Sequence, residues 1–425
     1  MMNFKIWNLY KAWRQKIWLR VVAISCLSVL SVALAQLLAP YVPELVALKA
    51  GSDAVSQILE ILASSMLAVT TFSLSIAVTG FGTAAATATP RATALLQEDT
   101  TTQNVLATFI GAFLFSLLGL IALNAQLYSQ SGKVVLYLFT ISVVLLVVIA
   151  LIRWIGHLMS FGRMDYTLDR VESATRIALA ARLGKPYLGG CPFEGPLPEG
   201  CIEIQASVTG YIEHIDMEAL QSVAETLGGE VYLPNVPGSF VVERGAIAHL
   251  RVESLSDEDV ARVQSAFAIG NQRAFDDDPR FGLIVFSEIA SRALSPAVND
   301  PGTAISVIGR LVRILTEWNA RADLEPDFPA VRVSPLRPAE AIEDAFRPIA
   351  RDGAPMIEVQ VRLQKALLAL RQSVPEAFNA PCAALSSYAL SLATAAGLPD
   401  AEIALLHRLS QSAPRSTERD ADMSV

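Results

Sequence analysis

The chain has 425 residues, and its 17% of charged side chains lies below the roughly 25% that is usual in soluble domains. This length suits about two or three domains. Residues 1–185 carry 14 basic and 8 acidic side chains, whereas residues 186–425 carry 19 basic and 33 acidic ones. The acidic second half excludes nucleic acid as an expected partner, because binding a polyanion requires basic groups that release its counterions.

Residues 1–20 carry five basic and no acidic side chains and are predicted to form an amphipathic helix at the membrane surface. Four uncharged apolar stretches follow, each close to the roughly 20 residues that cross a bilayer as a helix. They occupy residues 21–39, 61–81, 105–123 and 134–152. The sequence therefore predicts a four-helix transmembrane domain over residues 21–155, with the lipid bilayer as a partner.

The basic residues that flank these stretches predict the orientation. Residues 1–20 and 153–185 hold most of them, whereas each loop on the opposite side holds one lysine, Lys49 or Lys133. Since basic residues concentrate on the cytoplasmic side, we expect a multi-pass protein of the bacterial inner membrane with both termini in the cytoplasm. Small residues near position 35 leave open that residues 1–35 are cleaved as a signal peptide.

The second apolar stretch differs from the others, because small and hydroxyl side chains recur on one face at spacings of three and four residues. Its hydroxyl stripe consists of Ser64, Thr71, Ser75 and Thr79. Small residues let helices approach closely, and hydroxyls form hydrogen bonds between helices, so the stripe is interpreted first as a packing face. The alternative is that it lines a hydrated path through the membrane.

Helical periodicity continues after the last apolar stretch and predicts a helical stalk over residues 156–185, which Gly184 and Pro186 end. If the stalk continues the fourth span, one helix of roughly 50 residues and about 75 Å results. Its mostly apolar stripe consists of Phe161, Met164, Leu168, Val171, Thr175 and Ala178. Thr89 and Pro90 predict the start of a shorter helix that runs through Leu96.

The second half is predicted to be a cytoplasmic α+β domain. A Gly/Pro-rich linker over residues 186–200 precedes a small β-rich module, barrel- or sandwich-like, over residues 201–253. Within it Asp216 is predicted to cap a short helix that ends at Leu227, before a turn at Gly228, and Ser256 and Asp259 predict a capping box after the module. Residues 254–411 are predicted to be helical, at 257–269, 282–294, 301–319, 355–373, 380–396 and 400–411. Residues 320–355 are expected to form a long loop rich in proline and acids, and residues 412–425 a disordered tail.

Two polar clusters stand out in this domain, at residues 276–278 and 295–301. Asp300 and Pro301 suit the N-cap and the first position of a helix, so capping explains the second cluster without a ligand. The acidic run 276–278 lacks the spacing of a calcium loop and is interpreted as a solvated turn. The functional alternative is one cytoplasmic polar pocket that contains Arg273, Asp278, Arg292, Ser295, Asn299 and Asp300.

Catalytic motifs are not found in the sequence. It contains no H-E-x-x-H, no G-x-S-x-G and no Walker loop, and its four histidines are scattered. We therefore predict no catalytic residue, no metal ligand and no cofactor. His214 is expected to be a surface or packing residue of the β-rich module, as is His249.

Several segments together resemble the bacterial membrane protein family called domain of unknown function 2254. In the membrane part they are MLAVTTFSLSI at 66–76, TPR at 89–91 and GAFLFSL at 111–117. In the second half they are DPRFG at 278–282 and the segment from ALSP at 293 to NDPGTA, which ends at 304. The resemblance implies an integral membrane protein with a cytoplasmic domain, and it implies no activity.

Three functional hypotheses remain. The first is an oligomeric channel or transport-related protein, because a hydroxyl-bearing membrane helix is joined to a large domain that can regulate it. The second is a membrane-tethered interaction or sensor module without transport activity. The third is a membrane-anchored enzyme that uses the region of Arg273, Asp278, Asn299 and Asp300. We expect a homo-oligomer, and the identity of a small-molecule or protein ligand stays open.

Overall fold

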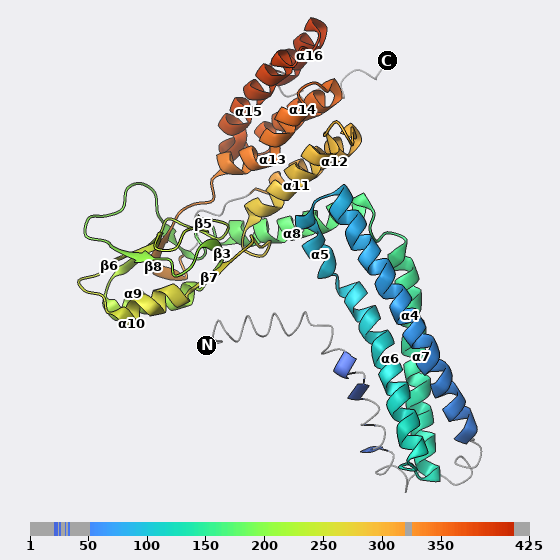
Figure 1. Ribbon diagram of the computed structural model, residues 1–425. Helices are drawn as coiled ribbons and strands as arrows, with labels where there is room; N and C mark the ends of the chain where they lie inside the picture. Colours follow the sequence, from blue (N-terminus) through green and yellow to red (C-terminus); the bar gives the residue numbers. More distant parts are fainter. Residues whose placement is uncertain are drawn as a thin grey trace, which may run out of the picture. The chain divides into compact units, whose positions relative to one another are not determined.

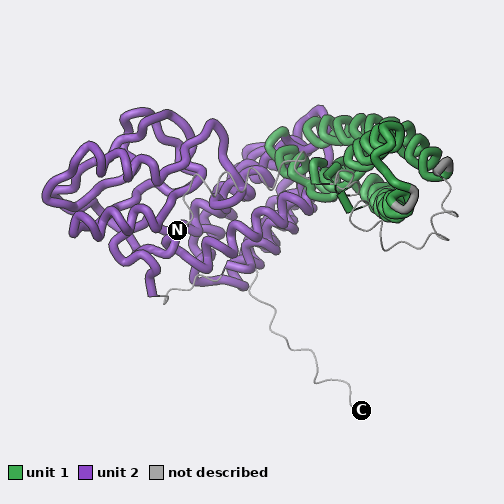
Figure 2. The backbone as a smooth tube through the Cα atoms, turned by 90° about the horizontal axis from the view of Figure 1, so that it is seen from below, with its two compact units in different colours: residues 1–86, 90–167 green, residues 87–89, 168–425 purple. Residues whose placement is uncertain are grey.

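The computed structural model describes residues 52–318 and 325–411, together with isolated positions between 21 and 34. The chain forms two compact units, shown in Figure 2. Unit 1 consists of residues 1–86 and 90–167, and unit 2 of residues 87–89 and 168–425. The predicted surface helix, the predicted tail and all but isolated positions of the first predicted span lie outside the described residues.

Unit 1 is helical. Its helices are α4 (Ser52–Thr87), α5 (Pro90–Gln97), α6 (Thr100–Asn124) and α7 (Gln130–Leu158), with α4, α6 and α7 side by side (Figure 1). Three of them contain apolar segments long enough to cross a membrane: Ala54–Thr87, Thr100–Asn124 and Gly132–Leu158. These segments confirm the last three predicted spans as apolar helices, and α5 confirms the predicted short helix after Thr89.

The core of unit 1 lies where α4, α6 and α7 meet. Leu59 of α4, Phe109 and Phe115 of α6 and Leu136 of α7 are fully buried there. The outer faces of the same helices are also apolar, and Phe72 remains 68% exposed. Large apolar side chains on the outside of a packed bundle are stable in a membrane, because lipid hydrocarbon and not water surrounds them there.

The stalk does not continue the fourth predicted span as one helix, because the chain turns at residues 159–163. There α7 ends at Leu158 and α8 (Met164–Gly184) begins. Gly162 adopts a positive φ of 79°, a conformation that interrupts a right-handed helix. The apolar periodicity identified α8 and its end at Gly184, but it did not reveal the turn between α7 and α8.

Unit 2 contains two β-sheets (Figure 1). The five-stranded sheet has the order β1 (Gly190–Pro192), β8 (Phe328–Val333), β4 (Glu230–Leu233), β6 (Ala246–Arg251) and β2 (Ile202–Gln205). The three-stranded sheet has the order β5 (Phe240–Val241), β3 (Gly210–Ile215) and β7 (Phe267–Gly270). Two helices, α9 (Met217–Leu227) and α10 (Asp257–Ser265), complete this part and share its core with both sheets.

The helix caps of this part confirm their sequence signals. Asp216 accepts a hydrogen bond from the Ala219 amide at the start of α9, and Gly228 ends the helix with φ 63°. Ser256 and Asp259 form the reciprocal capping box that begins α10.

The predicted loop over residues 320–355 is wrong in its second part, which contains β8 and the helix α13 (Pro338–Asp352). β8 lies between β1 and β4 and runs parallel to both. This strand is stabilised by pairing with strands more than 90 residues away in the sequence. Its own sequence contains a proline and gives no strand signal. The predicted linker likewise contains β1, and the predicted helix 257–269 ends early and is followed by β7.

The remaining helices pack into a bundle. They are α11 (Pro279–Ala293), α12 (Pro301–Leu315), α13, α14 (Ile357–Ser373), α15 (Pro375–Ala395) and α16 (Asp400–Gln411). α15 packs against α13 and α14, and α11 packs against α12 and α13. Phe286, Phe346 and Phe378 are fully buried between them. Unit 2 is therefore an α+β body in which α8 and α11 join the sheets to the helical bundle.

Candidate functional site

The site begins with the close approach of α8 and α11 in unit 2. A Cβ atom on Gly282 of α11 would overlap the side chain of Thr175 of α8, at 2.7 Å from Thr175 Cβ. Only glycine therefore permits this contact. Arg182 lies seven residues after Thr175, which is about two helical turns, so it shares the face of α8 that is turned toward α11.

Arg182 is buried, with 5% of its surface exposed. Its Nη2 donates a hydrogen bond of 3.2 Å to the carbonyl oxygen of Ser334, whereas Nη1 has no hydrogen-bond partner among the described residues. Burial lowers the pKa of Arg182 to about 10, although the nearby Asp277 and Asp278 favour its charged form. The side chain is therefore a buried cation at pH 7 with one end unsatisfied.

The start of the segment DPRFG lies near Arg182, because Asp278, Pro279 and Arg280 line one cavity together with it. Asp278 is 3% exposed and accepts two hydrogen bonds from Arg273, of 2.7 Å from Nε and 3.0 Å from Nη2. Its Oδ1 also accepts from the Phe281 amide at 3.2 Å and so caps α11. Burial raises the pKa of Asp278, although the hydrogen bonds from Arg273 oppose this effect. Arg273 and Asp278 are thus committed to each other in a forked ion pair.

Gly238 allows the β-rich part to approach that ion pair. Its φ is 93°, and a Cβ atom there would lie 2.8 Å from Oδ1 of Asp278 and closer still to Oδ2. Arg280 points elsewhere and contacts α13, where its Nε donates to Asp344 at 2.6 Å and its Nη1 pairs with Glu340. The DPRFG segment therefore contacts both the β-rich part and the helical bundle.

Two cavities meet at Arg182. The smaller has a volume of about 130 Å³, and its wall includes Ser239 and the Arg273–Asp278 pair. The larger has a volume of about 350 Å³, and its wall combines apolar side chains with His214, Lys185 and the carboxylates of Asp216, Glu218 and Asp276. Arg182, Pro237 and Asp277 line both cavities. We call the two cavities together the Arg182 site.

His214 and Asp277 form a second polar pair in the Arg182 site. Nδ1 of His214, on β3, lies 2.5 Å from Oδ2 of Asp277. Sequence reasoning missed this pair, because its partners are 63 residues apart. It also missed Arg182, for which a signal existed: the arginine stands four residues after Ala178 and so falls on the predicted apolar stripe of the stalk.

Residues 14–369 match the family described as predicted membrane protein DUF2254. The chain belongs to this family. The match contains every segment of the predicted resemblance, which it confirms. The DPRFG segment of this DUF2254 protein is therefore part of the shared region, as is Arg182.

Two relatives of the chain are described as uncharacterized proteins, one from Mycobacterium bovis and one from Mycobacterium tuberculosis. Each is 27% identical over 180 residues, which covers 41% of this chain and 34% of the relative. The chain therefore spans about a third of the length of these curated relatives. No solved structure matches the chain.

The six residues of the predicted polar pocket do not come together. Arg273 and Asp278 lie at the start of α11, whereas Arg292 is in its last turn and Ser295 follows it. Fifteen helical residues separate the two ends, or about 22 Å. At the far end the Ser295 hydroxyl donates to the carbonyl oxygen of Arg292 at 2.7 Å.

Asn299 and Asp300 form the start of α12 rather than a wall of the Arg182 site. Asp300 accepts hydrogen bonds from the amide and the hydroxyl of Thr303, at 3.0 and 2.6 Å, and these bonds lower the pKa of its carboxyl group. Asn299 adopts a positive φ of 50° in the turn before the helix. The predicted helix cap is thus confirmed, and of the predicted set only Arg273 and Asp278 line the Arg182 site.

The hydroxyl stripe of DUF2254 helix α4 lies on its exposed face, as Ser64, Thr71, Ser75 and Thr79 are all exposed. The first, second and fourth donate to carbonyl oxygens of their own helix, each at 2.9 Å. Such bonds satisfy hydroxyl groups inside a bilayer. Among the described residues the stripe does not face the contact of α4 with α6 and α7.

Unit 1 contains a buried polar cluster that sequence reasoning missed. Oδ2 of Asp99 accepts 2.8 Å hydrogen bonds from the amide and the hydroxyl of Thr102, and Oδ1 accepts a 3.0 Å bond from Tyr166. Nε2 of His157 lies 3.1 Å from Oδ2. Burial alone would raise the pKa of Asp99, but the hydrogen bonds from His157 and Thr102 outweigh it and hold the pKa below its usual range.

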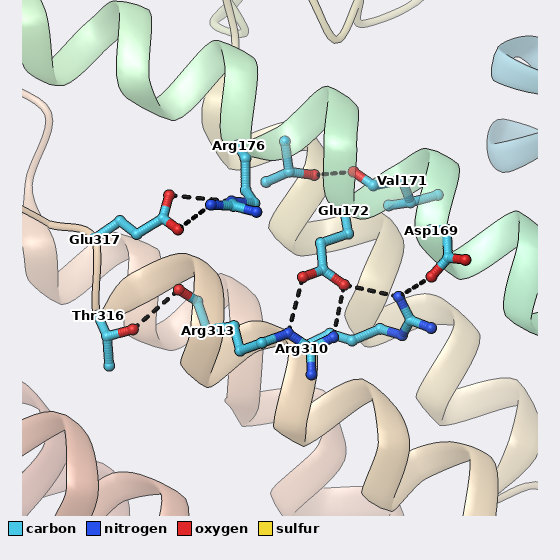
Figure 3. Close-up of polar contacts among 9 residues, drawn as sticks. Asp169, Val171, Glu172, Arg176, Arg310, Arg313, Thr316 and Glu317 are labelled. Atoms are coloured by element: carbon cyan, nitrogen blue, oxygen red, sulfur yellow. Dashed lines mark hydrogen bonds and ion pairs between the residues drawn. The ribbon is translucent and has the colours of Figure 1, made fainter.

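A ladder of charges joins α8 to α12 in unit 2. Figure 3 shows Glu172 of α8 directed toward Arg310 and Arg313 of α12, and Arg176 directed toward Glu317. The hydrogen bonds from Arg313, and more weakly those from Arg310, lower the pKa of Glu172 against the effect of burial. An open hollow of about 580 Å³ lies over the ladder. Because its carboxylates already pair with its arginines, the ladder is interpreted as a clamp between the helices.

The ladder predicts different losses of stability when its buried pair, Glu172–Arg310, and its exposed pair, Arg176–Glu317, are removed. Glu172→Ala should lower the free energy of unfolding of unit 2 by about 2 kcal/mol, because Arg310, only 11% exposed, loses its buried carboxylate partner. Glu317→Ala should leave stability close to that of the wild type, because the Arg176–Glu317 pair is largely solvated. Hydrogen exchange of the α8 and α12 amides measures both effects, and equal effects of the two variants would contradict the prediction.

Proposed function

We propose that the protein is a membrane-anchored sensor in which unit 2 binds a small ligand. The observation that supports this most strongly is the side chain of Arg182, which lines two cavities and whose Nη1 is a buried donor without a partner among the described residues. Buried polar groups in native proteins are almost always hydrogen-bonded, because an unsatisfied one costs free energy. An unsatisfied, buried arginine is therefore expected where a ligand completes its hydrogen bonds.

The proposal includes the topology expected from the sequence. Four spans place the protein in the bacterial inner membrane, and both termini and unit 2 lie in the cytoplasm. The basic residues at 1–20 and 153–185 support this orientation. A homo-oligomer is part of the proposal, because the hydroxyl stripe of α4 is exposed and available to a second copy. No catalytic step is proposed, since α11 separates the groups that the enzyme hypothesis requires.

The sensor proposal is tested on the full-length protein in lipid nanodiscs. Panels of anionic, cationic and neutral small metabolites are added, and the unfolding temperature of unit 2 is measured. We expect at least one chemical class to raise this temperature, because a ligand that binds only the folded state stabilises it. Absence of any shift over all three classes would overturn the proposal.

A second candidate function is an oligomeric channel or transport-related protein, which the exposed hydroxyl stripe favours. In an assembly of several copies this face of α4 would line a hydrated path. The test compares ion and solute flux through liposomes that contain the wild type or the Thr71→Leu/Ser75→Leu variant. Flux that the variant abolishes at unchanged oligomeric size supports the channel, and unchanged flux excludes this path.

A further inference from the structure

We propose that the Arg182 site binds a small metabolite through an anionic oxygen group, a carboxylate or a phosphate, held by Arg182. This inference rests on the proposed function and names the chemical class of its ligand. A guanidinium group carries only donors, so whatever completes the hydrogen bonding of Nη1 must present an acceptor. Anionic oxygens are the strongest acceptors for arginine.

The other charged side chains at the smaller cavity already have partners, so Arg182 is the one that we assign to the anionic group. Arg273 is committed to Asp278 by two hydrogen bonds, and Arg280 is committed to Asp344 and Glu340. Asp277, the acid that lines both cavities, pairs with His214. Among the described residues that line the smaller cavity, Arg182 is thus the arginine without a carboxylate in hydrogen-bond contact. An anion placed there replaces no existing ion pair.

A second donor lines the smaller cavity. The hydroxyl oxygen of Ser239 accepts a 3.2 Å hydrogen bond from the Val236 amide, so its own hydrogen remains to be donated. The volume of about 130 Å³ suits a single carboxylate or phosphate group rather than a whole metabolite. The anionic group is therefore placed in the smaller cavity, between Arg182 and Ser239.

The larger cavity constrains the rest of the ligand. Its volume of about 350 Å³ is at the lower end of the range for small-molecule sites, roughly 300–1,000 Å³. Its wall combines the apolar Met217 and Phe328 with the carboxylates of Asp216, Glu218 and Asp276 and with Lys185, whose ammonium group pairs with Asp327 at 2.6 Å. Carboxylates accept hydrogen bonds, so the body of the ligand carries donors, either hydroxyl or ammonium groups. Sugar or glycerol phosphates and amino acids share this combination.

The test measures binding to the full-length protein in nanodiscs by calorimetric titration at constant ionic strength. The probes are inorganic phosphate, glycerol 3-phosphate and glycine, with choline as the cationic comparison. We expect at least one anionic probe to bind, and its affinity to fall by at least about tenfold in Arg182→Met, the loss of one hydrogen bond to a charged group. Arg176→Met, which removes an exposed arginine of the same helix, is the matched control and should bind like the wild type.

Stability separates a binding role from a structural one. Without ligand, Arg182→Met should unfold at a temperature close to that of the wild type, because the removal of a buried charge with an unsatisfied donor offsets the loss of the hydrogen bond from Nη2 to the Ser334 carbonyl. A marked loss of stability without ligand would show that Arg182 is structural and would overturn the inference. Ser239→Ala provides a second variant, expected to weaken binding of the same probe while unit 2 stays folded.

The outcomes distinguish this inference from the sensor proposal. Binding of anionic probes that Arg182→Met does not weaken overturns the inference. If choline or a neutral metabolite binds and no anion does, the inference fails while unit 2 remains a ligand-binding module. If no class of metabolite binds at all, the proposed function and the inference fail together. Phosphate or glycerol 3-phosphate binding without glycine binding would identify the ligand as a phosphate, and the reverse would identify a carboxylate.

Discussion

Replacing Gly282 by alanine is expected to lower the free energy of unfolding of unit 2 by about 2 kcal/mol, within the usual cost of overpacking a core. The added methyl group would overlap Oγ1 of Thr175 and lie 2.7 Å from its Cβ and Cγ2. Thr175 cannot easily turn away, because its hydroxyl donates a 2.6 Å hydrogen bond to the carbonyl oxygen of Val171. The helices α8 and α11 must therefore separate. Pulse proteolysis in urea measures the change as a lower midpoint for unit 2.

Gly184→Ala is the matched control for this measurement. Gly184 ends α8, and a Cβ atom there meets nothing within 4 Å, so the change should not destabilise the protein. Adding Thr175→Ala to Gly282→Ala should recover part of the lost stability, because it removes the two atoms other than Cβ that the new methyl group meets. A midpoint of Gly282→Ala equal to that of Gly184→Ala would show that the two helices are not in close contact.

Elements whose stabilising contacts lie close in the sequence could be predicted. Asp216 and Gly228 bound α9 because each cap bonds to groups within a few residues. Asp300 and Pro301 begin α12 for the same reason. The apolar length of three membrane helices is likewise a property of the segment itself. These features follow from local hydrogen bonding and from the thickness of the bilayer.

Elements that depend on distant partners could not be predicted. β8 pairs with β4 and β1, which come more than 90 residues earlier, whereas the prolines and acids of residues 320–355 predict a loop. Of the candidate site, the sequence identified Arg273 and Asp278 but not Arg182. Arg182 lacks a hydrogen-bond partner for Nη1 because of how residues near 237 and 334 lie around it. The local sequence does not show which hydrogen-bond partners a side chain has in the folded protein.

The residues of the predicted polar pocket lie at opposite ends of α11, so residues that are close in the sequence do not form one site here. Asp278 and Asp300 both precede a proline and both begin a helix, so they look like members of one motif. Each carboxylate instead caps its own helix, and the length of α11 keeps them apart. Only Asp278 gains an arginine partner, Arg273, and only its end of α11 contacts the β-rich part. The Arg182 site consequently lies at one cap and not at the other.

The second large effect is expected at Asp99, the centre of the buried polar cluster of unit 1. Asp99→Ala should lower the free energy of unfolding by about 3 kcal/mol, because Thr102, His157 and Tyr166 all lose their carboxylate partner in a buried place. The measurement is the temperature at which the full-length protein in detergent loses its monodisperse peak in size-exclusion chromatography. Asp165→Ala, at an exposed carboxylate of the same unit, is the control and should leave that temperature near the wild-type value.

The pH dependence of unit 1 should identify the same carboxylate. In the folded state the pKa of Asp99 lies below its value in the unfolded chain, which is about 3.9. Its contribution to stability is therefore complete above about pH 4 to 5 and is lost as the pH falls toward the folded-state pKa. Asp99→Asn cannot titrate, so this variant should lack that part of the acid destabilisation while it is less stable than the wild type at pH 7. Parallel acid profiles for the wild type and Asp99→Asn would mean that the carboxylate is not held ionised by His157 and Thr102.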